Sequence, residues 1–134
     1  MNKSIVITLL VTALTSPLAH AEMVVIVNPQ SSVAALSAEQ VANIYLGKDV
    51  ALAPVDLPEA NGARNEFYRK VTGKDAAQVK TIWARLIFTG NAKPPKEVGS
   101  PAEAVALVAA SPNAIAYVDK SLVNGSVKAV LSIN

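Results

Sequence analysis

The chain has 134 residues, with 12 basic and 10 acidic side chains and a formal net charge of +2. This charge is too small to indicate general electrostatic binding to nucleic acid, so we expect no nucleic-acid partner. The sequence contains no cysteine and one histidine, His20. His20 lies in the predicted targeting segment at the N-terminus, so the rest of the chain lacks the usual zinc ligand sets and the Ser-His and Cys-His catalytic pairs, and we expect no cofactor.

The first residues have the pattern of a secretory signal peptide. Lys3 precedes an almost wholly apolar run over residues 5–14, and Ala-His-Ala at residues 19–21 fits the small-x-small rule for cleavage. A membrane anchor is the alternative, but the apolar run is shorter than the roughly 20 residues that a spanning helix needs. We therefore predict a cleaved signal peptide over residues 1–21 and a single periplasmic domain over residues 22–134. Removing 21 of the 134 residues leaves 113, which is enough for one modest core.

Two strands with a helix between them are predicted at the start of the exported part. Residues 23–27, MVVIV, are apolar and rich in β-branched side chains, which indicates a buried strand. Ser37 and Gln40 form a capping-box pair that begins a helix, and Gly47 ends it. Residues 51–57, ALAPVDL, indicate a second short strand.

Two helices are predicted in the middle of the chain. The first covers residues 62–72 and ends at Gly73, and Asp75 caps the second, which covers residues 76–88. Apolar residues recur at three- and four-residue spacing along the second helix, so one of its faces is expected to be buried. This face comprises Ala76, Val79, Ile82, Trp83, Leu86 and Ile87, and we assign both Trp83 and Phe88 to packing.

The last part of the chain predicts a helix and two strands. Ser100, Pro101 and Glu103 have the pattern of a helix start, and the helix runs to about residue 110. Residues 114–118 and 127–133 indicate strands. Because strands and helices alternate at the start and helices cover the middle, we predict a three-layer α/β domain with a small, mostly parallel sheet.

The first candidate binding site is the helix start Asn61-Gly62-Ala63-Arg64. In open α/β sheets, ligands bind beyond the carboxyl ends of the strands, where helices begin with free N–H groups and a partial positive charge. Gly62 and Ala63 let a ligand approach the backbone closely, and Arg64 adds a two-pronged contact, which suits phosphate, sulfate or a carboxylate. The alternative is that Asn61 only caps the helix and that Arg64 lies in solvent.

The second candidate is the loop after the first strand. Ser31 and Ser32 offer hydroxyl donors there, although a serine-rich loop is more often only a loop. A third segment follows the strand at residues 114–118, in which Tyr117 is expected to lie in the core. If the sheet is mostly parallel, the three segments gather at one of its ends.

Catalytic motifs are absent from the sequence. The stretch VTGKD at residues 71–75 is similar to the end of a P-loop but lacks the earlier glycine and the following serine or threonine. Neither G-x-S-x-G nor S-x-x-K occurs. Asp56 and Glu59 offer a pair of carboxylates, but nothing in the pattern marks either as buried. We expect that the protein is not an enzyme.

Four segments of the sequence resemble a known family when they are taken together. VVIVNPQSSVAALSAEQVANIYLGK, ANGARNEFYRKVTG, WARLIFTG and AEAVALVAASPNAIAYV occur in this order. The set resembles the phosphate-binding group of type II periplasmic substrate-binding proteins of ABC transporters, and it covers nearly all of residues 22–134. That family has a Ser-Gly-Thr-Arg stretch that binds phosphate oxygens at a helix start. The matching stretch Asn61-Gly62-Ala63-Arg64 keeps the glycine and the arginine and loses two hydroxyls. Leu57 stands where the family has a further arginine, and Ala116-Tyr117 stands where it has Gly-Tyr.

The resemblance implies that residues 22–134 form one lobe of such a binding protein. Since a full binding protein encloses its ligand between two lobes, one lobe is expected to bind weakly unless it dimerises or meets a partner. The predicted function is periplasmic binding of a phosphate-like oxyanion for uptake or sensing. The candidate protein partners are a membrane permease or sensor and a second copy of the chain. The alternative is a ligand-free interaction module that docks to a membrane protein.

Overall fold

The computed structural model describes residues 22–90 and 92–134. The predicted signal peptide lies outside these residues. Within them, no helix is both long and apolar enough to cross a membrane. The helices and strands are, in chain order, β1 (Met23–Val27), α1 (Ala38–Tyr45), β2 (Ala53–Asp56), α2 (Gly62–Thr72), α3 (Ala76–Phe88), β3 (Lys96–Glu97), α4 (Pro101–Ala110), β4 (Ala114–Asp119), the 3-10 helix η1 (Lys120–Leu122) and β5 (Lys128–Ile133).

The helices begin and end where the local sequence predicts. The side chain of Ser37 accepts a hydrogen bond from the backbone of Gln40, whose side chain accepts one in return, so the capping box before α1 is confirmed. Asp75 and Gln78 form the same arrangement before α3. Gly73 ends α2 in the left-handed conformation, at φ 71°, which glycine adopts without steric penalty.

The five strands form one sheet in the order β3-β2-β4-β1-β5. β2 pairs in parallel with β3 and β4, whereas β1 pairs antiparallel with β4 and β5. Four strands therefore run in one direction and β1 alone runs against them. The predicted small, mostly parallel sheet is confirmed, and the direction of β1 decides which loops meet at each end of the sheet.

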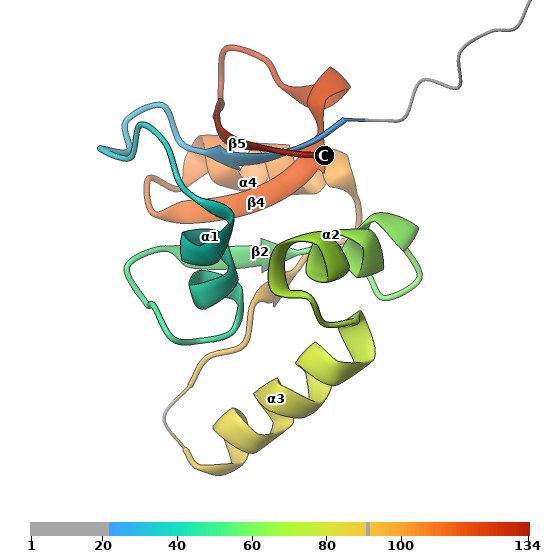
Figure 1. Cartoon of the computed structure of the whole chain (residues 1–134). Coiled ribbons are helices and arrows are strands. Elements are labelled where there is room, and N and C mark those ends of the chain that lie inside the picture. Colours follow the sequence, from blue (N-terminus) through green and yellow to red (C-terminus); the bar gives the residue numbers. More distant parts are fainter. Residues whose placement is uncertain (1–21, 91) are drawn as a thin grey trace, which may run out of the picture.

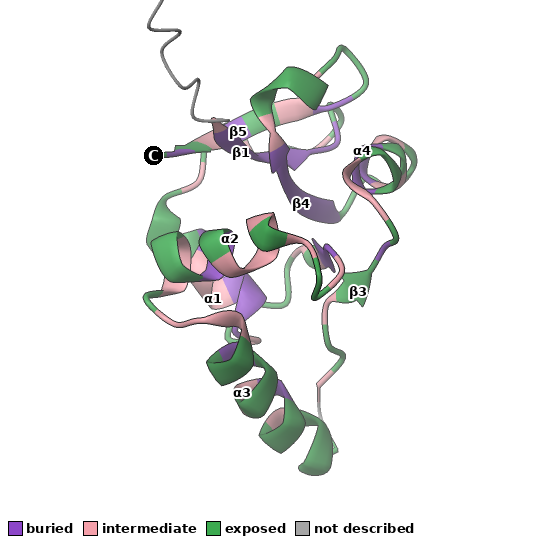
Figure 2. Cartoon of the chain, turned by 90° about the vertical axis from the view of Figure 1, so that its right-hand side faces the viewer, coloured by how far each residue is buried: buried purple, intermediate pink, exposed green. Residues whose placement is uncertain are grey.

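The helices lie on both faces of the sheet, as the three-layer prediction requires. α1 and α2 cover one face and α4 covers the other (Figures 1 and 2). The core beneath α1 and α2 contains a cluster of aromatic rings. Phe67 and Tyr117 stack with their ring centres 3.9 Å apart, and Tyr45 meets Phe67 edge-on at 4.7 Å. This cluster joins α1, α2 and β4 and confirms that Tyr117 is a core residue.

Helix α3 leans away from the body of the molecule, and only part of its apolar face is buried (Figure 2). Trp83 is buried, and its Nε1 donates a 2.9 Å hydrogen bond to the carbonyl of Tyr45, which confirms its assignment to packing. Phe88, however, is 93% exposed and Ile87 is 48% exposed. The predictions that Phe88 packs in the core and that Ile87 lies on the buried face are therefore wrong, because α3 extends past the edge of the body of the molecule. The spacing of apolar residues along a helix indicates which face is apolar. It does not indicate how much of that face is covered by neighbouring elements.

Candidate functional site

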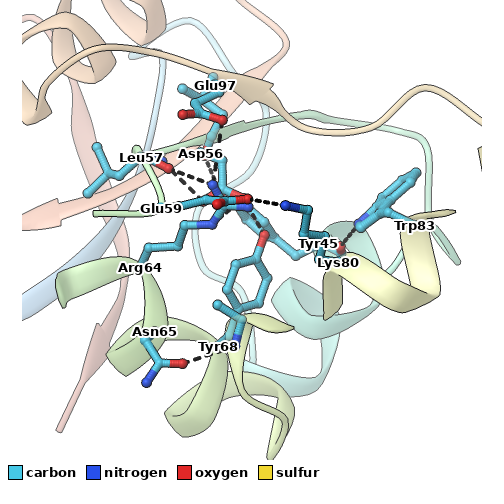
Figure 3. A network of polar contacts seen from close by, with 12 residues as sticks. Tyr45, Asp56, Leu57, Glu59, Arg64, Asn65, Tyr68, Lys80, Trp83 and Glu97 are labelled. Carbon is cyan, nitrogen blue, oxygen red and sulfur yellow. Dashed lines mark hydrogen bonds and ion pairs between the residues drawn. The ribbon is translucent and has the colours of Figure 1, made fainter. Parts of the chain in front are cut away.

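A buried carboxylate lies at the end of β2, beside the start of α2 (Figure 3). Asp56 is 3% exposed. Its Oδ2 accepts a 2.5 Å hydrogen bond from the hydroxyl of Tyr68, and its Oδ1 accepts hydrogen bonds from the hydroxyl of Tyr117 and the backbone N–H of Leu57. All three neighbours donate, which suits the ionised form of the carboxylate because that form only accepts.

The two tyrosine hydroxyls are held in their neutral form. Burial raises the pKa of Tyr68 and of Tyr117 well above the ordinary value of 10.0, and the neighbouring charge of Asp56 raises both pKa values further. Burial also raises the pKa of Tyr45, whose hydroxyl donates to the carbonyl of Val55 at 2.8 Å. All three tyrosines therefore remain hydrogen-bond donors throughout the physiological pH range.

Arg64 supplies the positive charge that faces Asp56. Its side chain is 12% exposed, with Nε 3.7 Å from Oδ2 of Asp56 and Nη1 3.6 Å from Oε2 of Glu97. Nη1 also donates a 3.0 Å hydrogen bond to the carbonyl of Leu57. Nε is buried without a hydrogen-bond partner in the described structure, and no hydrogen bond from Nη2 is found among the described residues. The guanidinium is thus fixed in place with part of its donor capacity unused.

The backbone at the start of α2 has partners from within the chain. Asn61 is the N-cap residue, and its Oδ1 accepts a 3.0 Å hydrogen bond from the N–H of Ala63. The N–H of Arg64 donates to the carbonyl of Asn61 at 3.1 Å. Gly62 is exposed, and a Cβ atom added there would meet no atom within 4 Å. Asn61 therefore has the capping role, as in the alternative interpretation, whereas Arg64 lies in a buried ion pair rather than in solvent.

A cavity of about 350 Å³ opens between this cluster and α3. Its polar wall combines three carboxylates with two cations. Glu59 and Lys80 belong to this wall and pair with each other at 2.8 Å, and the pairing is the main reason that the pKa of Glu59 lies below its ordinary value. Its apolar wall consists of Val79, Trp83, Ala84, Ile87, Pro94 and Pro95.

A second cavity, of about 440 Å³, also borders Trp83 and is lined by Ile44, Leu52 and Pro54. Its rim includes the exposed Val50 together with Lys93 and Lys96. Among the described residues, no group of three or more His, Cys, Asp or Glu side chains is placed to hold a metal ion.

Ser31 and Ser32 lie at the opposite end of the sheet from the start of α2. In the antiparallel pairing, Val27 at the end of β1 lies opposite Ile115, near the start of β4. The loop after β1 therefore meets the starts of β2 and β4, and the prediction that the three segments gather at one end is wrong. The N–H of Val33 donates to the Oγ of Ser31, and Lys128 donates to the Ser31 carbonyl at 2.7 Å.

The candidate site that the sequence predicts and the one that the structure assembles overlap only at the start of α2. The sequence offers Asp56 as one of two carboxylates but does not mark it as buried, because a carboxylate at the end of a strand is usually solvated. Tyr117 is expected only as a core residue and Tyr68 is not singled out, and the sequence contains no sign that their hydroxyls converge on Asp56. The signal that could have pointed to them is the position of Asp56, directly after two apolar residues of a strand and directly before Leu57.

No protein-family model matches the chain, and no curated protein sequence matches it. Solved structures do match its fold. A phosphate ABC transporter substrate-binding protein with bound phosphate from Clostridium perfringens is 23% identical, with a TM-score of 0.67, over 81% of this chain and 44% of that one. An ABC-type phosphate transport receptor from Vibrio cholerae is 21% identical, with a TM-score of 0.64, over 81% and 45% of the two chains. PstS from Borrelia burgdorferi is 13% identical, with a TM-score of 0.62, over 81% and 46%.

The chain spans less than half the length of each of these structures. The first is a substrate-binding protein and the second a transport receptor. The described part of the chain therefore has the fold of one lobe of the substrate-binding proteins of phosphate ABC transporters.

Proposed function

We propose that the chain is a periplasmic binding protein for a small oxyanion, which it holds beside Arg64 and presents to a membrane permease or sensor. The observation that supports this function is the state of Arg64. Its guanidinium is almost buried, is fixed by the carbonyl of Leu57, and borders a cavity with part of its donor capacity unused. Such a preorganised guanidinium forms strong charge-assisted hydrogen bonds to an oxyanion.

The start of α2 adds to this binding site. Gly62 leaves room for close approach, and the helix end contributes a partial positive charge. Ser31 and Ser32 are a separate binding element in this proposal, since they lie at the other end of the sheet. Affinity is expected to be weak, because Asn61 already accepts from one N–H group and Asp56 already neutralises much of the charge of Arg64.

A titration of the purified protein with phosphate, sulfate and acetate tests this proposal by NMR. We expect the amide signals of residues 61–65 to shift most. Replacing Arg64 with glutamine should weaken binding by about tenfold to about 150-fold, the usual effect of losing a charge-assisted pair. Arg69→Gln is the matched control, because Arg69 is an exposed arginine on the same helix. If residues 61–65 stay still at tens of millimolar anion, on the order of the weakest binding that counts as specific, the proposal fails.

A ligand-free interaction module remains the second candidate function. Two observations favour it. The side chain of Asn61 and the carboxylates of Asp56 and Glu97 already engage the groups that would receive an anion. Phe88 is almost fully exposed, and a large exposed apolar side chain is typical of a protein contact when others lie near it. In the titration above, this function predicts no shift at residues 61–65 for any anion.

A further inference from the structure

We propose that the cavity between α2, α3 and β3 binds a zwitterion with an aliphatic group, as in an α-amino acid with a branched apolar side chain. The inference rests on the proposed function, because the carboxylate of this ligand would occupy the place beside Arg64. It adds an ammonium group and an apolar body to the oxyanion.

The charges of the cavity wall favour a ligand with both signs. Three carboxylates face two cations, so the wall has one negative charge in excess; the five residues are Asp56, Glu59, Glu97, Arg64 and Lys80. A simple anion adds to this excess, whereas a zwitterion leaves it unchanged. An ammonium group near the carboxylates would also stabilise a neighbouring carboxylate of the same ligand.

The ion pairs of the wall leave donors and acceptors for such a ligand. The 3.6 Å separation between Arg64 and Glu97 is too long for a hydrogen bond, so each group keeps capacity for another partner. Nε of Arg64 is buried and faces Asp56, so the donor left for a ligand is Nη2, for which no hydrogen bond is found among the described residues. Glu97 lies on β3 and its side chain is 54% exposed, so its carboxylate is accessible to an incoming ammonium group. Arg64 is thus placed to receive the carboxylate and Glu97 the ammonium group.

The opposite wall fits an aliphatic body. Val79, Trp83 and Ile87 line it from α3, and Pro94 and Pro95 line it from the segment before β3. The volume of about 350 Å³ lies at the lower end of the roughly 300–1,000 Å³ of pockets for organic ligands, which are mostly apolar with a few placed polar groups. Inorganic phosphate would leave this wall in contact with water. An aliphatic side chain would cover it, including the half-exposed Ile87.

The fluorescence of Trp83, the only tryptophan of the chain, reports on this cavity directly. The probes are leucine, glycine, isocaproate, isoamylamine and inorganic phosphate. Glycine lacks the aliphatic group of leucine, isocaproate lacks its ammonium group, and isoamylamine lacks its carboxylate. We expect leucine to bind about tenfold or more tightly than each of the others, because each lacks a group that the wall contacts.

The outcomes separate this inference from the proposed function. If phosphate or isocaproate binds as tightly as leucine, the ligand is a simple anion, and the inference is overturned while the proposed function stands. If no probe with an anionic group binds, both fail. If isoamylamine binds as tightly as leucine, the site is one for cations, and both fail as well.

Substitution of Glu97 distinguishes binding of the ligand's ammonium group from a purely structural role of this residue. Glu97→Gln should weaken leucine binding by about tenfold and strengthen isocaproate binding, because it removes the ammonium acceptor and one repelling charge. Glu66→Gln, an exposed glutamate of α2 that pairs with Lys70 outside the cavity, is the control and should change neither. An equal loss of leucine and isocaproate binding in Glu97→Gln would mean that Glu97 only positions Arg64, and the assignment of the ammonium site would be wrong.

Discussion

The hydroxyl of Tyr68 on α2 donates a 2.5 Å hydrogen bond to the carboxylate of Asp56 at the end of β2. This hydrogen bond connects α2, which also carries Arg64 of the candidate site, to the sheet. Tyr117 on β4 donates to the same carboxylate from the neighbouring strand. Asp56 therefore connects three elements through a single buried side chain, and the position of Arg64 depends on it.

Removal of the Asp56 side chain should destabilise the fold strongly. Asp56→Ala leaves two buried hydroxyls and a nearly buried guanidinium without their partner, and breaking a buried charged cluster in this way costs about 3–5 kcal/mol of unfolding free energy. Asp56→Asn keeps one acceptor oxygen and should lose less. Denaturant unfolding followed by circular dichroism measures both, with Glu66→Ala as an exposed control expected to change stability by about 0.5 kcal/mol or less. A loss below about 1 kcal/mol for Asp56→Ala would contradict the structural role of this cluster.

Stability should fall steeply in alkaline solution. The pKa values of Tyr45, Tyr68 and Tyr117 are raised in the folded state, mainly by burial, so unfolding lets each hydroxyl lose its proton once the pH exceeds about 10. The contribution of these protonated hydroxyls to the unfolding free energy is fully present below about pH 10. It is lost as the pH rises from about 10 through the folded-state pKa values of the tyrosines. Each tyrosine lowers the unfolding free energy by ~1.4 kcal/mol per pH unit in that range.

The near-ultraviolet absorbance of phenolate, recorded beside circular dichroism, measures this effect. We expect ionisation of all three tyrosines to coincide with loss of the fold. Independent titration of any tyrosine near pH 10 in a folded protein would show that its hydroxyl is accessible to solvent, which would contradict its buried position.

Two aromatic residues of α3 should differ sharply in their contribution to stability. Trp83→Ala removes a buried ring and its hydrogen bond to Tyr45, and should cost about 3–5 kcal/mol. Phe88→Ala lies five residues further along the same helix and removes an exposed ring, so it should change stability by about 0.5 kcal/mol or less. The pair is measured by the same denaturant unfolding. A large loss in Phe88→Ala would mean that another part of the protein or a second copy covers this turn.

The N-terminus of the exported protein should be Glu22. The pattern at residues 19–21 predicts cleavage after Ala21, and Glu22 then takes part in the fold, where its carbonyl accepts a 2.7 Å hydrogen bond from the N–H of Lys120. Mass spectrometry of protein recovered from the periplasm of the expressing cell tests this. Full-length protein retained in the membrane fraction would contradict the prediction.

The sequence by itself predicts the positions and types of the main helices and strands, since these depend on short-range interactions. The capping box at Ser37, the cap at Asp75 and the helix end at Gly73 are set by residues a few positions apart, and the structure confirms each. The apolar spacing of α3 likewise identifies the face on which Trp83 is buried.

Only the tertiary structure decides which of these elements meet. Strand pairing is set by contacts between residues far apart in the chain, so nothing local indicated that β1 runs against β4 and carries Ser31 to the far end of the sheet. For the same reason, the sequence did not show that Asp56 is buried beneath Tyr68 and Tyr117, or that Arg64 faces this carboxylate. Propensity and periodicity depend on near neighbours, whereas the environment of a charged side chain depends on every element that folds against it.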